Sequence, residues 1–231
     1  MKLILFSAIF YFVIFMNLSI SKDSSFLKPK IYPPSNLKHF TFGFDSVLAD
    51  LFWLRVIQDI DYCENETGVK SVNSGTDIDS IVAKELSSSR CNMGWVYQMV
   101  DLVTELSPRF RRAYRIGAEV LSVGVDDREG ARRIFDKGVK QFPKYWMLHY
   151  SAAYHYLFEI QDKERAADLL VSASKNGGPY FLAIMASSLY QKDGQKAVAL
   201  SLLRGLEKKY EDIPEFKEEI QKKIQTIKNE N

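Results

Sequence analysis

The most regular feature of the chain is a pattern of small and large apolar positions that recurs along residues 110–210. Residues 110–143 have the pattern of two short helices joined by a polar turn. In the second half of this segment, a small residue is followed four positions later by a large apolar one, and three positions after that by another small or apolar residue. The matching positions are Ala131, Phe135 and Gly138, then Ala166, Leu170 and Ala173, then Ala199, Leu203 and Leu206. The first halves match as well, at Tyr114, Ala118 and Leu121 and again at His149, Ala153 and Tyr156.

This order of residue sizes has a steric reason. A small residue allows two helices to approach closely, and a large apolar residue one turn later fills the space between them. Pro143 and Pro179 follow the first two copies, and proline ends a helix. The pattern therefore predicts an all-α chain built from stacked helical pairs.

The helix, turn, helix period of about 34 residues resembles that of the tetratricopeptide repeat family. The resemblance implies an all-α fold whose repeats stack as a short right-handed α-solenoid. Within a repeat region at 40–210, the repeats fall at 110–143, 144–178 and 179–210, after a degenerate repeat at 40–108 that is interrupted by an inserted loop at 63–91. Each turn is one residue longer than in the family pattern. An unrelated antiparallel helical bundle is the alternative.

Two further stretches are similar to a narrower group, the membrane-targeted tetratricopeptide-like proteins of bacteria. They are Ala49–Arg55, with the sequence ADLFWLR, and Asp101–Phe110, with the sequence DLVTELSPRF. The resemblance implies an accessory or scaffold role, and it brings no catalytic residues with it.

The N-terminal segment predicts insertion into a membrane. Residues 3–20 form an uncharged apolar run of about eighteen residues. We expect residues 1–21 to be either a signal anchor, which forms an N-terminal hydrophobic helix, or a signal peptide cleaved after Ser21. The first alternative leaves the protein anchored in the membrane and facing the periplasm or the cell exterior. The second secretes it to the periplasm.

The segments on either side of the repeats have distinct patterns. Residues 22–39 contain three prolines and predict an extended tether. Residues 40–62 predict a strong amphipathic helix with Asp45 as its N-cap, and residues 95–106 predict a second helix. Residues 211–231 alternate Lys and Glu around an apolar stripe, which is typical of the capping helix of a repeat array.

Cys63 and Cys91 are the only cysteines, and they flank a loop rich in Ser, Asn, Asp and Gly. Outside the cytoplasm we expect them to form a disulfide that closes about 28 residues. Two unpaired thiols are the alternative, which a cytoplasmic location would favour.

The composition and motifs of the chain argue against catalytic activity and against metal or cofactor binding. The 31 basic and 29 acidic residues leave a net charge of +2, which argues neither for nor against a nucleic-acid partner. We expect no nucleic-acid partner. His149 and His155 lie six positions apart on one predicted helix and do not share a face. Since the chain lacks a phosphate-binding glycine loop, a nucleophile elbow and a metal-ligand spacing, we expect no enzyme activity, no cofactor, no metal and no small-molecule ligand.

The family resemblance implies that the first helix of each repeat lines a concave, partner-binding groove. The groove residues it implies are Arg112, Arg115, Glu119, Tyr150, Tyr154, Tyr180, Ser187 and Tyr190. Arginine and tyrosine favour a protein or peptide partner, because guanidinium binds carboxylates in pairs and tyrosine offers contact area at low entropic cost. The first hypothesis is therefore a non-catalytic scaffold or adaptor, and the second is a recognition subunit for a cell-wall glycan or exported polysaccharide.

A purely structural role for the same side chains is the remaining alternative. The arginines at the start of the first full repeat would then pair with Asp50 and Asp101, and the tyrosines would belong to the core.

Overall fold

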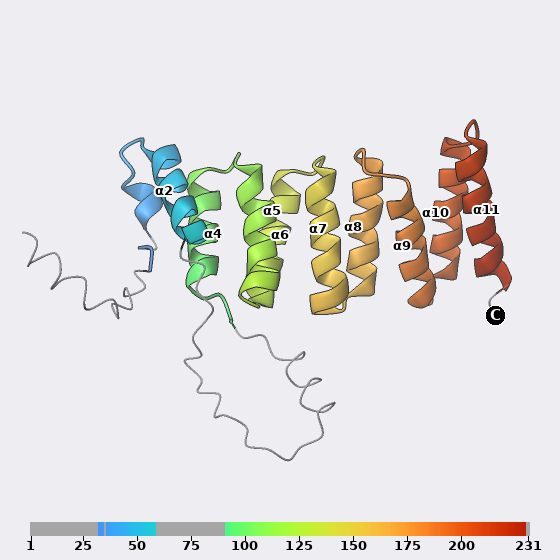
Figure 1. The fold of residues 1–231 in the computed structure, drawn as a ribbon, viewed down its shortest axis with the longest axis horizontal. Helices are drawn as coiled ribbons and strands as arrows, with labels where there is room; N and C mark the ends of the chain where they lie inside the picture. Colours follow the sequence, from blue (N-terminus) through green and yellow to red (C-terminus); the bar gives the residue numbers. More distant parts are fainter. Residues whose placement is uncertain (1–31, 35, 59–90, 230–231) are drawn as a thin grey trace, which may run out of the picture. The chain divides into compact units, whose positions relative to one another are not determined.

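The computed structural model describes residues 32–34, 36–58 and 91–229, and all regular structure within these ranges is helical. The predicted all-α class is therefore confirmed. The chain divides into a unit at Met1–Tyr32 and a unit at Pro33–Asn231, and the helices belong to the second unit. Consecutive helices of this unit pack against one another side by side (Figure 1).

The helices are short and follow one another closely. In chain order they are η1 (Leu37–His39, a 3₁₀ turn), α2 (Asp45–Gln58), α4 (Trp95–Leu106), α5 (Arg111–Glu119), η2 (Val120–Gly124), α6 (Arg128–Gln141), α7 (Trp146–His155), η3 (Tyr156–Ile160), α8 (Lys163–Lys175), α9 (Phe181–Lys192), α10 (Lys196–Lys209) and α11 (Pro214–Asn229). The first helices of three pairs, α5, α7 and α9, start 35 residues apart at Arg111, Trp146 and Phe181. The helix predicted at 95–106 has the bounds expected for it.

The recurring small and large residues form the core between these helices. The small residues Ala131, Ala166 and Ala199 and the large residues Phe135, Leu170 and Leu203 are all completely or almost completely buried. Gly138 shows how close the approach is, because a Cβ atom there would lie 2.9 Å from both Leu148 Cδ2 and Tyr114 Cβ. The side chains of Tyr114 on α5 and Leu148 on α7 therefore pack directly on the backbone of α6 at this point.

Two π-helical turns contain the additional residue that the sequence predicts between the helices of a pair. Helix α5 continues directly into η2 and α7 into η3, and the Val125 N–H donates to the Val120 carbonyl across five residues, as in a π-helix. The start of the second helix lies 17 residues after the start of the first in the pairs α5–α6 and α7–α8, but 15 in α9–α10, which has no such turn. Buried Asp127 caps α6 by accepting from the Gly130 N–H at 2.8 Å, and Asp162 caps α8 in the same way.

Helix α2 differs from its prediction as an amphipathic helix. It begins at Asp45, and residues 59–62 lie outside the described part of the chain. Its inner face buries Ala49 and Val56, but its outer face is also apolar, with Val47, Leu51 and Leu54 about half exposed. The helix is therefore not divided into one apolar and one polar side.

Helix α11 closes the other end of the unit. Ile220, Ile224 and Ile227 are buried against the preceding helices, and α11 packs mainly on α10. Its outer face is polar and carries the Lys222–Glu218 ion pair at 2.7 Å. This is the arrangement that a capping helix requires.

Several predictions lie outside the described residues: the apolar segment at 1–21, most of the tether at 22–39, and the loop from 63 to residue 90. Among the helices that the structure describes, none is both long and apolar enough to cross a membrane.

The predicted disulfide also involves an undescribed residue, Cys63. Cys91 is buried beside α4, and its N–H donates to the Asp126 carbonyl at 3.2 Å. We predict that peptide mapping without reductant recovers a linked Cys63–Cys91 peptide. Reduction should lower the free energy of unfolding by about 3 kcal/mol, as the loop-entropy relation gives. Recovery of both peptides with alkylated thiols would contradict the pairing.

The close approach at Gly138 predicts a strong sensitivity to one methyl group. Gly138→Ala should lower the free energy of unfolding by about 1–3 kcal/mol, because the added Cβ overlaps Leu148 and Tyr114. The matched variant Gly205→Ala, on the exposed face of α10 where a Cβ meets nothing within 4 Å, should raise it by about 0.5–1 kcal/mol. Urea unfolding of the full chain followed by circular dichroism measures both. Equal effects of the two variants would contradict the tight packing.

Candidate functional site

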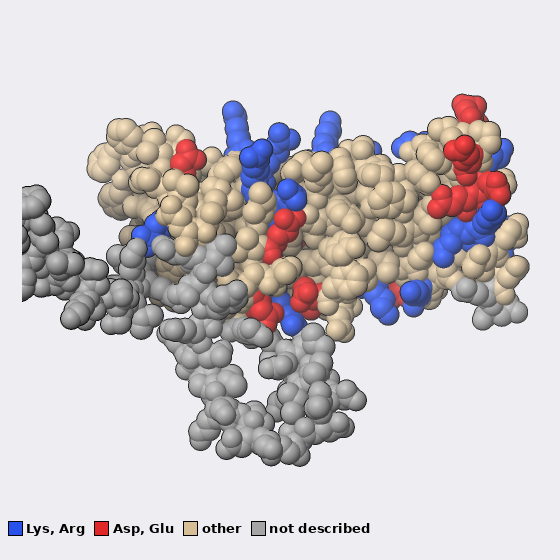
Figure 2. All heavy atoms as spheres, viewed as in Figure 1, with Lys and Arg blue, Asp and Glu red and all other residues tan. Residues whose placement is uncertain are grey.

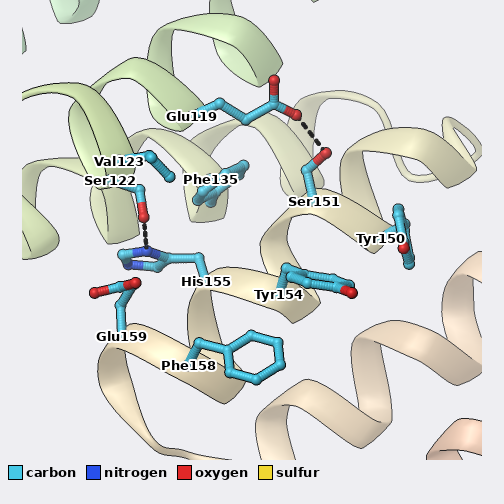
Figure 3. Close-up of a pocket in the computed structure, with 10 residues that line it drawn as sticks. All are labelled: Glu119, Ser122, Val123, Phe135, Tyr150, Ser151, Tyr154, His155, Phe158 and Glu159. Carbon is cyan, nitrogen blue, oxygen red and sulfur yellow. Dashed lines mark hydrogen bonds between the residues drawn. The ribbon is translucent and has the colours of Figure 1, made fainter.

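A cavity of about 420 Å³ opens between the α5–η2 segment and the α7–η3 segment (Figure 3). The two segments are the first helices of consecutive pairs. The lining residues are Glu119, Ser122, Val123, Phe135, Tyr150, Ser151, Tyr154, His155, Phe158 and Glu159. Its volume is within the usual range for ligand pockets in proteins.

Aromatic rings form one wall of the cavity. Tyr150, Tyr154 and Phe158 lie four residues apart along α7 and η3, so they share one helix face. The ring centroids are 5.3 Å apart for Tyr150 and Tyr154 and 5.0 Å apart for Tyr154 and Phe158. Phe158 is 58% exposed, and Val123 on the facing η2 turn is 84% exposed. Burial, and then a hydrogen bond with Tyr154, raise the pKa of Tyr150, so its phenol stays protonated at neutral pH.

A paired carboxylate lies at one end of the cavity. Glu119 accepts from Arg115 Nη1 at 3.0 Å and from the Ser151 hydroxyl at 2.6 Å (Figure 3). The second contact joins α5 to α7 across the cavity. Arg115 is thus neutralised within its own helix, and its buried Nε atom has no hydrogen-bond partner among the described residues.

A serine and a histidine meet at the opposite end. Ser122 Oγ lies 2.8 Å from His155 Nδ1, and His155 Nε2 lies 3.1 Å from the Arg128 carbonyl oxygen. Since a carbonyl only accepts, Nε2 carries the proton and Nδ1 accepts from the Ser122 hydroxyl. Burial lowers the pKa of His155 to about 4, although the hydrogen bond to Arg128 opposes the shift. A histidine with this pKa is neutral at pH 7, and it is a weak general base.

Glu159 stands beside this pair and is also balanced by a cation. Arg128 Nε lies 3.3 Å from Glu159 and 3.1 Å from Asp126. The cavity is therefore apolar and aromatic along its length, with one carboxylate at each end, each held by an arginine.

The structure brings together four of the groove residues predicted from the sequence. Glu119, Tyr150 and Tyr154 line the cavity, and Arg115 pairs with Glu119. Arg112 is exposed one turn earlier on α5 and does not line the cavity.

The other three predicted residues lie elsewhere. Tyr180 stacks on Phe216 of α11, with ring centroids 4.0 Å apart, and donates to Glu219 at 2.6 Å. Ser187 is fully buried, and Tyr190 is nearly so and donates to Asp168 at 2.5 Å. Ser187 occupies the tight helix-contact position that Gly117 has in α5, which explains why it faces the interior.

Seven lining residues were not predicted from the sequence: Ser122, Val123, Phe135, Ser151, His155, Phe158 and Glu159. Four of these seven lie in η2 or η3. For the four residues in η2 and η3, the sequence contains one indication, the additional residue in the turn. It indicates an irregular turn but does not show which side chains face the cavity.

No family model, curated protein or solved structure matches the chain. In the described part of the chain, no group of three or more histidine, cysteine or acidic side chains is arranged to hold a metal ion.

The buried His155 predicts a loss of stability in mild acid. Its pKa is lower in the folded chain than the ordinary value of 6.5, so the unfolded chain binds the proton more tightly, and stability falls as the pH falls below 6.5. Between pH 7 and 5 this one group should remove about 2 kcal/mol from the free energy of unfolding. Burial lowers the pKa of His149 as well, which adds to the effect.

The matched variant is His155→Gln, which cannot titrate. Urea unfolding at pH 7, 6 and 5 should show a shallower pH dependence for this variant than for the parent, with the remaining slope due to His149. Hydrogen bonds from Arg132 lower the pKa of Glu129 to about 2, so this carboxylate titrates below the pH range of the experiment. An unchanged slope in the variant would contradict the assignment.

Proposed function

We propose that this chain is a non-catalytic interaction scaffold or adaptor, built as a tetratricopeptide-like right-handed α-solenoid and tethered at a bacterial membrane. The cavity between α5–η2 and α7–η3 binds a segment of a protein or peptide partner. The 35-residue spacing of α5, α7 and α9 and the matching buried positions support the repeat architecture.

The observation that carries the binding role is the set of exposed apolar side chains around one cavity. Val123, Tyr154 and Phe158 are each at least 46% exposed and face the same opening. Large aromatic side chains beside a pocket supply most of the binding energy in protein interfaces. Contacts within the chain leave these side chains about half exposed or more, so apolar surface remains for a partner.

The charges favour an apolar side chain of the partner over a carboxylate. Arg115 already pairs with Glu119, so an incoming carboxylate has to displace a charge that is present in the same helix. An apolar side chain instead replaces water against Tyr154 and Phe158 without disturbing the Glu119–Ser151 contact. The anchor of the partner is therefore a large apolar residue.

A glycan is the second candidate occupant. Tyr150, Tyr154 and Phe158 place three aromatic rings in a row, with interplanar angles of 68° and 44° between neighbours, and sugar rings stack on aromatic side chains. This candidate corresponds to a recognition subunit for a cell-wall glycan or an exported polysaccharide.

A catalytic role has less support. The Ser122–His155 pair resembles a nucleophile with its base, but a histidine with a pKa of about 4 removes a proton poorly at neutral pH. Ser122 is also buried. The pair is better explained as a bridge that fixes η2 against α7.

The membrane tether is proposed from the sequence alone. Residues 3–20 supply the apolar segment and residues 22–39 the spacer. The repeats then face the periplasm or the cell exterior, or are released into the periplasm if cleavage follows Ser21.

The decisive experiment compares two phenylalanines of similar exposure. Phe158→Ala removes the cavity ring, whereas Phe181→Ala removes a ring that is 44% exposed on α9 outside the cavity. Tagged full-length protein is crosslinked in cells, and the captured proteins are quantified by mass spectrometry. We expect Phe158→Ala to lower the affinity for the captured partner by about 2 kcal/mol, or about thirtyfold, and Phe181→Ala to leave it unchanged.

The same comparison separates the alternatives. Equal capture by both variants would show that the cavity does not bind the partner. Retention of an isolated cell-wall glycan by the parent but not by Phe158→Ala, without capture of protein, would favour the glycan.

A further inference from the structure

The outer face of α2 is an exposed apolar surface outside the cavity. Phe44, which directly precedes α2, is 62% exposed, and Val47, Leu51 and Leu54 on the helix are 52%, 54% and 50% exposed. The opposite face of the helix packs on α4 through Ala49 and Val56, so these four side chains have no role in that contact.

The two ends of the helical unit differ in this respect. In Figure 2, acidic and basic side chains gather over α10 and α11, whereas the α2 end of the same view is mostly uncharged. The terminal helix of a stacked array needs a polar outer face to remain soluble by itself. Helix α11 meets this requirement and α2 does not, which indicates that another element covers α2.

The spacing along α2 identifies the kind of element. Phe44, Val47, Leu51 and Leu54 are separated by three, four and three residues, the alternation of the a and d positions in a two-stranded coiled coil. A helix that packs along this seam fits it better than a lipid surface does. Interfacial membrane helices carry a lysine-rich or arginine-rich polar face, and α2 contains one arginine and two aspartates.

The charges beside the seam match a second copy of the same helix. With Phe44 and Leu51 at a, Asp50 occupies a g position and Arg55 the e position of the next heptad. In a parallel pair, g of one helix faces e of the other five residues further on, so Asp50 lies opposite Arg55 of the other copy, and the two-fold axis repeats the pair. Arg55 also has a contact within its own chain, so its guanidinium would be shared.

We infer that α2 forms a parallel, two-helix contact with α2 of a second copy of this chain, through Phe44, Val47, Leu51 and Leu54. Parallel pairing places the N-terminal ends of the two α2 helices at the same end of the contact, as two copies tethered to one membrane require. A seam of two heptads is a small interface and binds weakly in solution, but tethering raises the effective concentration of the partner. The surface is separate from the cavity, so the inference does not depend on the binding role of the cavity. Its arguments from orientation and effective concentration rest on the proposed membrane tether.

The test is site-specific photocrosslinking of the full-length chain in cells that express two differently tagged copies. A photoreactive amino acid replaces Val47. We expect an adduct of twice the chain mass that carries both tags, with the crosslink in residues 45–58 of the second copy. Adding Leu54→Glu should lower its yield at least about tenfold, because a carboxylate buried in the seam is unpaired. Val198→Glu, at a position 44% exposed on α10, is the matched control and should leave the yield unchanged.

A charge exchange tests the parallel orientation. Asp50→Arg should lower the yield, since it places two arginines opposite each other. The double variant Asp50→Arg, Arg55→Asp should restore it. Failure to restore the yield would overturn the parallel pairing.

Other products would overturn the inference in distinguishable ways. A crosslink within one chain would show that the chain covers α2 itself, and an adduct with lipid or with a different protein would identify another occupant. Phe158→Ala should not change the two-copy adduct, so loss of cavity binding and loss of pairing are measured separately.

Discussion

The close approach of neighbouring helices at small residues is the constraint on which the rest of this structure depends. At Gly138 the backbone of α6 lies so near α5 and α7 that one additional methyl group would overlap Leu148 and Tyr114. The small residues Ala131, Ala166 and Ala199 are completely buried on α6, α8 and α10, the second helices of three successive pairs. Because each contact sets the distance and register of the next helix, the side chains of α5 and α7 are presented to each other at a defined separation. The cavity between them results from this spacing.

The π-helical turns η2 and η3 modify this regular packing at one junction. Each extends a first helix by an irregular turn, and together they bring Ser122, Val123, Phe158 and Glu159 to the cavity. The pair α9–α10 has no such turn and is two residues shorter. π-Helical turns are often found at functional sites, because they place side chains where a regular helix cannot. Their presence on both sides of one cavity is therefore the structural reason to regard this junction, among the described ones, as the binding site.

The unit also presents three surfaces of different chemical character. The cavity is flanked by balanced carboxylates, so its apolar interior is bounded by polar groups that define its ends. The face of α2 is an open apolar stripe with a single charge of each sign beside it, which suits a flat helical contact. The polar outer face of α11 suits solvent. In the roles proposed above, the partner binds in the middle of the helical unit and a second copy of the chain associates at one end.

The sequence by itself determined the all-α class, the helical pairs, the capping helix and the buried positions, because all of these follow from local periodicity and residue size. It also located Glu119, Tyr150 and Tyr154, which lie on the outward face of regular first helices. Only the tertiary structure decided that Ser187 and Tyr190 are interior, that Arg115 is already paired, and that α2 is apolar on its outer face. These properties depend on how closely neighbouring helices approach and where a helix departs from regular geometry, and the periodicity of one helix contains neither.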